Sequence, residues 1–165
     1  MAKSSQALLI AALFFFGLLG LAHCHDFVVE GRVYCDTCRA LFETRVSKPM
    51  ADAPVRLTCR NRVNGTISET VEAVCDDLGT YKITVDGEHE DDICEMSVVK
   101  TSITDCDEHV PGKDRARVVL THNNGVVSRT RYASPLGFLA KKTLDVCPEV
   151  LKELGLLTTV DLSTL

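Results

Sequence analysis

The sequence has no tryptophan, few aromatic residues and no excess of basic residues. Aromatic side chains are 5% of the 165 residues, and 18 Lys and Arg stand against 23 Asp and Glu, a formal net charge of −5. Nucleic acids and anionic membrane surfaces are bound through basic surfaces, so neither is expected as a partner. Because 45% of the residues are hydrophobic and 25% are charged, a chain that is disordered throughout is excluded.

Long apolar runs are absent after the N-terminal region, and the run found there is short. Residues 7–22 are almost wholly apolar, follow a basic start and end in small residues. A helix needs about 20 apolar residues to span a bilayer, so we predict a secretory signal peptide over residues 1–22 rather than an anchor. Cleavage after residue 22 and cleavage after Cys24 both fit. We therefore expect one secreted, extracellular β domain over residues 23–165, with a loose C-terminal tail and no membrane insertion.

Alternation of apolar and polar residues predicts a fold made mostly of strands, because successive side chains of a strand point to opposite faces. Segments with this pattern are 27–35, 55–60, 81–85, 94–98 and 116–120, and weaker candidates are 66–74 and 126–132. Turn-forming pairs such as Asn64-Gly65 and Asp86-Gly87 separate them. The prediction is an all-β fold, an antiparallel barrel or sandwich of about seven strands.

Two segments have helical features. Residues 40–46 are compatible with a short helical turn after the first strand. Residues 148–154 begin with proline and are followed by Gly155, and proline near a helix start with glycine just after its end is the usual asymmetry of helix termini. We expect a short C-terminal helix at the second segment.

Eight cysteines give the strongest chemical signal in the chain. Cys35 and Cys38 form a C-x-x-C motif, but the other cysteines are isolated and no two histidines have ligand spacing, so zinc is not favoured. A thioredoxin-type redox pair lies at a helix start in a βαβ unit, whereas this motif ends a predicted strand. Structural disulfides in an exported domain are the favoured interpretation. Cys75 is the cysteine expected to remain outside the other disulfides, and it is either free or paired with Cys24.

The segment around this motif resembles the signature decapeptide of the major olive pollen allergen family. It has the sequence EGRVYCDTCR over residues 30–39. The resemblance extends over about residues 27–155 through four more cysteines and one apolar segment: Cys59, Cys94, Cys106, Cys147 and residues 134–138.

This resemblance implies both a disulfide framework and a function. The implied pairs are Cys35 with Cys106, Cys38 with Cys147, and Cys59 with Cys94, while Cys75 has no counterpart in the family pattern. The family fold is an all-β barrel or sandwich with no established catalytic residues and no cofactor. Its members are extracellular pollen proteins linked to pollen hydration, germination and tube growth, and many bind IgE. The resemblance thus implies a cell-surface receptor or a cell-wall component as partner.

Two further features are candidate sites. Asn64-Gly65-Thr66 is an N-glycosylation acceptor, so we expect a glycan on Asn64. Residues 86–92 form an acidic run whose oxygens would suit calcium, but its spacing is not that of an EF-hand loop. We expect a solvated loop there and no metal.

A third feature is a group of arginines on two late strand candidates. They are Arg115, Arg117, Arg129 and Arg131. Their alternation predicts one basic, solvated sheet face. That face is the best candidate for contact with an anionic wall polymer or an acidic partner.

The favoured function is therefore binding rather than catalysis. Nothing in the sequence places a nucleophile beside a base, so we expect no enzymatic activity. The hypothesis is a secreted, non-enzymatic pollen protein and allergen that presents a rigid surface to its partner. The alternatives are a secreted thiol-redox enzyme that uses the C-x-x-C motif, and a protease inhibitor.

Overall fold

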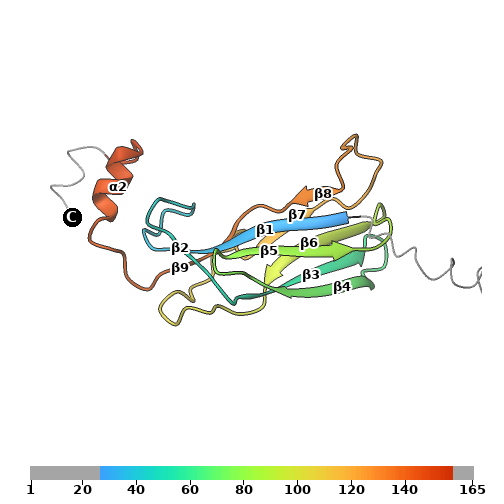
Figure 1. Ribbon diagram of the computed structural model, residues 1–165, viewed down its shortest axis with the longest axis horizontal. Helices are drawn as coiled ribbons and strands as arrows, with labels where there is room; N and C mark the ends of the chain where they lie inside the picture. The colour runs from blue at the N-terminus through green and yellow to red at the C-terminus, as the bar shows by residue number, and fades with distance from the viewer. Residues whose placement is uncertain (1–26, 158–165) are drawn as a thin grey trace, which may run out of the picture.

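In the computed structural model the described residues are 27–157, and they form a β-sandwich with one short helix (Figure 1). The first sheet consists of β1 (Phe27–Asp36), β2 (Lys48–Pro49), β5 (Thr80–Val85), β8 (Thr130–Tyr132) and β9 (Leu136–Leu139). The second sheet has the order β4 (Ile67–Val74), β3 (Pro54–Asn61), β6 (Asp92–Val98) and β7 (Arg115–Val118). The predicted all-β sandwich is confirmed, and the predicted signal peptide and Cys24 lie outside the described residues.

Strand β1 is the centre of the first sheet. It pairs antiparallel with β5 and β2, and parallel with β8 and β9. The sheet is therefore mixed: the expected antiparallel pairing is found with β2 and β5 and throughout the second sheet, but β8 and β9 pair parallel to β1. The physical reason is a crossover: residues 119–129 carry the chain from β7 in the second sheet back to β1, so β8 arrives in the direction of β1.

Strict alternation determines which side chains form the core. On β3, Val55, Leu57 and Cys59 are fully buried, whereas Arg56 and Arg60 point outward. The inward side chains of β5, β6 and the first half of β1 alternate in the same way, whereas the last four residues of β1 are all buried. The two inner faces thus form one hydrophobic cluster between the sheets, as alternation predicts for a sandwich.

Residues 27–157 form nine strands rather than about seven. Strands β2 and β9 were not predicted, and residues 126–132 contribute only the three residues of β8. All four residues of β9 are buried, so β9 lacks the alternation that identifies a half-buried strand. Residues 40–46 form turns and bends instead of a helical turn.

The C-terminal helix α2 (Cys147–Glu153) is where the sequence predicts it. Pro148 lies in its first turn, and Gly155 follows its end with a φ of +72°. In Figure 1, α2 lies beyond the end of the sandwich at which β1 finishes, opposite the end at which β1 begins. Within residues 27–157, none of the helical structure is both long and apolar enough to cross a membrane.

Candidate functional site

The C-x-x-C motif lies where β1 leaves the sandwich, and its two cysteines are bonded to different partners. Cys35 is linked to Cys106, 71 residues away, and Cys38 is linked to Cys147, 109 residues away. This is the pairing that the family resemblance implies. Because the two motif sulfurs are not bonded to each other, the motif has neither the internal disulfide nor the free thiolate of a redox pair.

The polar residues of the decapeptide are also engaged in structural contacts. The buried Asp36 carboxylate accepts hydrogen bonds from the backbone N–H groups of Cys38 (3.1 Å) and Leu41 (2.7 Å). Arg39 donates two hydrogen bonds to Glu108, at 2.6 and 2.7 Å. These bonds lower the pKa of the Glu108 carboxyl group. Arg39 also donates to the Ala140 carbonyl at 2.8 Å, so the motif connects its own turn to the segments that contain Glu108 and Ala140.

Two glycines of the matching segments lie under tyrosine rings. Gly31 pairs with Tyr81 across β1 and β5, and a Cβ atom at Gly31 would lie 2.2 Å from the Tyr81 hydroxyl oxygen. Gly137 pairs with Tyr34, and a Cβ atom there would lie 2.9 Å from the Tyr34 ring. Both contacts require glycine for space. The decapeptide is thus a structural feature from Gly31 to Arg39 rather than a reactive centre.

The third disulfide, Cys59–Cys94, joins directly opposed residues of β3 and β6. A ring nitrogen of His89 lies within 4.8 Å of both sulfurs, which makes this the one group in residues 27–157 with the composition of a metal site. Each sulfur is bonded to the other, however, and metal ligation by cysteine needs a thiolate. The two ring nitrogens of His89 are hydrogen-bonded to Asp92 (2.9 Å) and to the Asp86 carbonyl (3.2 Å). The cluster is therefore structural while the disulfide is intact.

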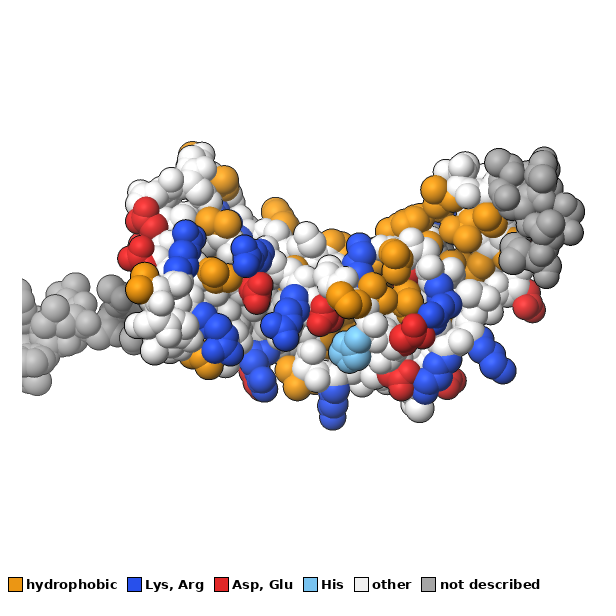
Figure 2. Space-filling model, turned by 180° about the vertical axis from the view of Figure 1, so that it is seen from behind, with side chains coloured by type: hydrophobic (Ala, Val, Ile, Leu, Met, Phe, Trp, Pro, Cys, Tyr) orange, Lys and Arg blue, Asp and Glu red, His pale blue; other side chains and the backbone are white. Residues whose placement is uncertain are grey.

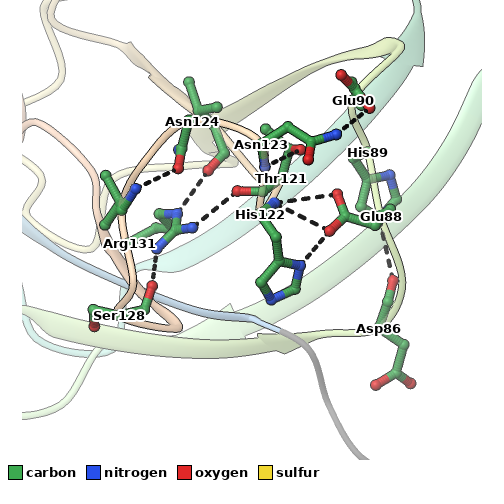
Figure 3. A network of polar contacts seen from close by, with 12 residues as sticks. Asp86, Glu88, His89, Glu90, Thr121, His122, Asn123, Asn124, Ser128 and Arg131 are labelled. Carbon is green, nitrogen blue, oxygen red and sulfur yellow. Dashed lines mark hydrogen bonds and ion pairs between the residues drawn. The ribbon is translucent and has the colours of Figure 1, made fainter.

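The acidic run 86–92 is exposed except around His89 and Asp92, as expected for a loop, but its side chains hold the neighbouring loop (Figure 3). Glu88 forms an ion pair with His122, and its pKa is lowered mainly by that hydrogen bond. Glu90 accepts a hydrogen bond from the Asn123 amide at 2.8 Å. Two carboxylates of this run thus connect its loop to the loop that contains His122 and Asn123.

The arginines of the two late strands do not share a face, so that prediction is wrong. Arg131 is buried, lies 5.0 Å from the centre of the Phe27 ring and donates to the Thr121 and Val119 carbonyls, both at 3.0 Å (Figure 3). Arg115 and Arg117 are exposed on β7 in the second sheet, and Arg129 is exposed just before β8, whereas Arg131 on β8 in the first sheet points into the molecule. The charge pattern alone could not reveal this, because it does not say which sheet each strand joins.

A different set of arginines forms a basic surface on the outer side of the second sheet. The pairing registers place Arg56 beside Ser97 and Ser97 beside Arg115, and Glu95 beside Arg117. We call the group consisting of Arg56, Arg60, Arg115 and Arg117 the arginine face. The sequence contained this signal, since Arg56 and Arg60 alternate with buried residues of β3.

The arginine face has more cations than neutralising carboxylates. Glu95 contacts Arg117 at 3.4 Å and Arg115 at 4.0 Å, Asp114 contacts Arg115 at 3.9 Å, and Glu72 contacts Arg56 at 2.7 Å. Arg60 is exposed and has no charged partner among residues 27–157. A shallow groove of about 180 Å³ runs over this face between polar side chains: Arg56, Thr58, Arg60, Glu95, Ser97 and Arg115. On the face drawn in Figure 2, Lys and Arg side chains are interspersed with Asp and Glu. The excess of cations on the arginine face can attract a negatively charged partner to an otherwise acidic chain.

Residues 27–157 thus form a β-sandwich that is cross-linked by three disulfides. A family model described as "Pollen protein Ole e 1 like" matches residues 25–155. The anther-specific protein LAT52 of Solanum lycopersicum is 45% identical over 150 residues, covering 90% of this chain and 93% of that protein. Pollen allergen Che a 1 of Chenopodium album is 49% identical over 154 residues, covering 90% and 92%.

A solved structure agrees with these sequence matches. The crystal structure of the major plantain pollen allergen Pla l 1 is 34% identical, with a TM-score of 0.63, and the match covers 72% of this chain and 96% of that one. The chain belongs to the Ole e 1-like family of pollen proteins. This family consists of non-enzymatic proteins, which confirms the expectation that the chain is not an enzyme.

Proposed function

We propose that the protein is secreted from pollen and acts by binding an anionic partner, a cell-wall component or a receptor, during hydration, germination or tube growth. The observation that carries this proposal is the arginine face, where four arginines stand against three carboxylates on a chain with a net charge of −5. Charged surfaces of this kind speed encounter and select partners of opposite sign.

The sheet under the arginine face suits this role. The backbone of β3 is bonded to β4 and β6, and the Cys59–Cys94 disulfide joins β3 to β6. The arginines therefore start from fixed backbone positions, so binding costs mainly the entropy of side chains. Carboxylates fit best as the partner's groups, because a guanidinium binds a carboxylate through two parallel hydrogen bonds.

Secretion also agrees with the surroundings of Asn64. This residue lies in the exposed turn between β3 and β4, where its side-chain oxygen accepts hydrogen bonds from the backbone N–H (2.9 Å) and hydroxyl (2.7 Å) of Thr66. The amide nitrogen of Asn64 remains available to a glycosyltransferase. We propose that Asn64 carries a glycan, which replacement by Gln would remove.

Binding to polygalacturonate, a carboxylated wall polymer, and to intact pollen tubes tests the function. We expect binding of the oxidised protein to weaken with salt, and the pair Arg60→Glu and Arg117→Glu to lose at least tenfold in affinity. The matched control is Lys100→Glu with Lys152→Glu, two exposed lysines outside the arginine face. If the arginine variant labels pollen tubes as strongly as the unmodified protein does, the arginine face is not the binding surface.

If the arginine variant loses pollen-tube labelling while neither protein binds polygalacturonate, the partner is an acidic receptor surface rather than this polymer.

IgE binding in sensitised hosts is proposed from the allergens among the relatives. Immunoblots of the folded and the reduced protein with sera from sensitised donors would test it.

A further inference from the structure

A second surface feature lies near the other two disulfides. A pocket of about 380 Å³ opens between the end of β1, the loop that contains Cys106 and the segment that leads from β9 to α2. Small-molecule sites are usually pockets of roughly 300–1,000 Å³, so its size suits a compact ligand rather than a polymer. Its location separates it from the outer surface of the second sheet.

The pocket is lined by small or apolar groups in its interior. Its most buried lining residues are Cys35, Thr37, Cys106 and Ala140, and the partly buried Ile103 and Leu144 complete the apolar part. The space remains open because the side chains at its base are small. An aromatic ring or a short alkyl chain can therefore remove apolar surface from water there.

Covalent and backbone bonds hold this pocket in shape. The Cys35–Cys106 disulfide fixes its base, and Cys38–Cys147 fixes the chain that follows its far wall. Between these bonds, the Lys141 N–H donates to the Asp105 carbonyl at 2.9 Å. A site that is formed before the ligand arrives loses little free energy to ordering.

The exposed lining residues are mostly cationic. Lys141 is engaged by Asp107 at 3.1 Å and donates to the Thr104 carbonyl at 3.0 Å. Lys48 and Lys142 also line the pocket and are exposed, and neither side chain has an ion pair or hydrogen bond within residues 27–157. One carboxylate, on Asp105, opposes them. The pocket therefore has an apolar base and two uncommitted ammonium groups.

The geometry points to a binding site for a small amphipathic carboxylate, with its apolar body on the disulfide, Ile103 and Leu144 and its carboxylate at Lys48 or Lys142. An aromatic acid and a short fatty acid share this chemistry. The inference stands apart from the arginine face, which binds a polymer or a protein surface in the function proposed above.

Titrations of the oxidised protein with cinnamate and octanoate, followed by amide chemical shifts, test this site. We expect saturable binding with a Kd below about 1 mM, with shifts concentrated at Ile103, Ala140 and Leu144. The uncharged amides of the two acids should bind at least fivefold more weakly. The tighter of the two acids shows whether the site favours an aromatic or an alkyl acid.

Charge-reversal variants give the matched comparison. Lys48→Glu with Lys142→Glu should weaken carboxylate binding at least tenfold, whereas Lys152→Glu on α2 should leave it unchanged; all three side chains are exposed, so the fold is preserved. The site is refuted if the amides bind as tightly as the acids, if the shifts lie elsewhere, or if the double variant binds normally. Absence of saturable binding to either acid also refutes it.

Discussion

At the scale of single residues, the Gly31–Tyr81 pair shows why the matching decapeptide needs glycine. Tyr81 is almost fully buried, and its hydroxyl has no hydrogen-bond partner within the described part of the chain. Burial also raises its pKa. The ring covers Gly31, so packing, rather than a polar contact, holds the hydroxyl in place. Rings over glycines are a known way to stabilise strands that contain them.

Gly31→Ala should therefore destabilise the protein although it adds only a methyl group. The new Cβ would lie 2.4 Å from Tyr81 Cζ, so the ring, which is only 1% exposed, would have to shift away from β1. Overpacking of this kind costs about 1–3 kcal/mol, which chemical denaturation would measure. Tyr81→Phe is the control: it removes an unpartnered hydroxyl and should leave stability unchanged or higher. A neutral Gly31→Ala variant would contradict the close packing.

Cys75 is the one free thiol among residues 27–157, and it is buried. Burial raises its pKa from 9.0 to about 11. A thiol with a raised pKa favours the folded state below its unfolded pKa, and this contribution disappears as pH rises from about 9 to about 11. The thiolate is the reactive form, so the native thiol should be inert near neutral pH.

We predict that a thiol reagent such as DTNB labels Cys75 at pH 8 only after the protein unfolds. The absence of a reaction in native buffer and a complete reaction in guanidinium chloride would show this. The Cys75→Ser variant gives the background signal. Rapid labelling of the native protein would mean that the end of β4 opens readily.

At the scale of secondary-structure elements, the sequence predicted those segments whose burial alternates. The alternation of β3 and β5 identified both strands and their inward faces, and proline and glycine located α2. Strand β9 was missed because Gly137 and its neighbours are buried without alternation. The inward direction of Arg131 depends on long-range pairing with β1, which no local pattern contains.

The arginine face was only half predictable for the same reason. The sequence showed that Arg115 and Arg117 alternate on one strand, and that Arg56 and Arg60 alternate on another. The finding that these strands flank β6 required the order of the second sheet. A candidate surface that crosses several strands is thus set by topology rather than by sequence neighbours.

Helix α2 depends on the Cys38–Cys147 disulfide more strongly than the β-sandwich depends on this same bond. Cys38–Cys147 joins the helix to the turn that follows β1, and a 3.0 Å ion pair joins Glu153 to Arg45 in the loop between β1 and β2. Both side chains of that pair are about half exposed, and exposed pairs contribute about 0–1 kcal/mol. A helix of seven residues is also too short to be stable alone.

Replacing Cys38 and Cys147 by Ser should consequently release α2 while the sandwich persists. We expect faster hydrogen exchange and proteolysis after residue 140, with little change in β3 and β6. The matched control replaces Cys59 and Cys94 by Ala, which should lower the unfolding temperature without exposing the C-terminal segment. Equal protection of α2 in both variants would show that packing, and not the disulfide, holds it.

At the scale of the whole molecule, the disulfides connect three different regions. Two of them attach the loop of Cys106 and helix α2 to the end of β1, and the third joins β3 to β6 inside the second sheet. No disulfide links β3 or β6 directly to the first sheet. Contact between the two layers therefore rests on the hydrophobic cluster, while the disulfides limit the freedom of the unfolded chain.

Full reduction should consequently lower the unfolding temperature by well over 10 °C. The bridges close intervals of 71, 109 and 35 residues, and each native disulfide typically contributes about 2–4 kcal/mol. One kcal/mol shifts the unfolding temperature of a domain of this size by about 3–6 °C. Calorimetry of the oxidised protein and of the reduced, alkylated protein measures the shift, with the alkylated but unreduced protein as control. An unchanged transition would show that the core alone stabilises the fold and that the bridges serve another purpose.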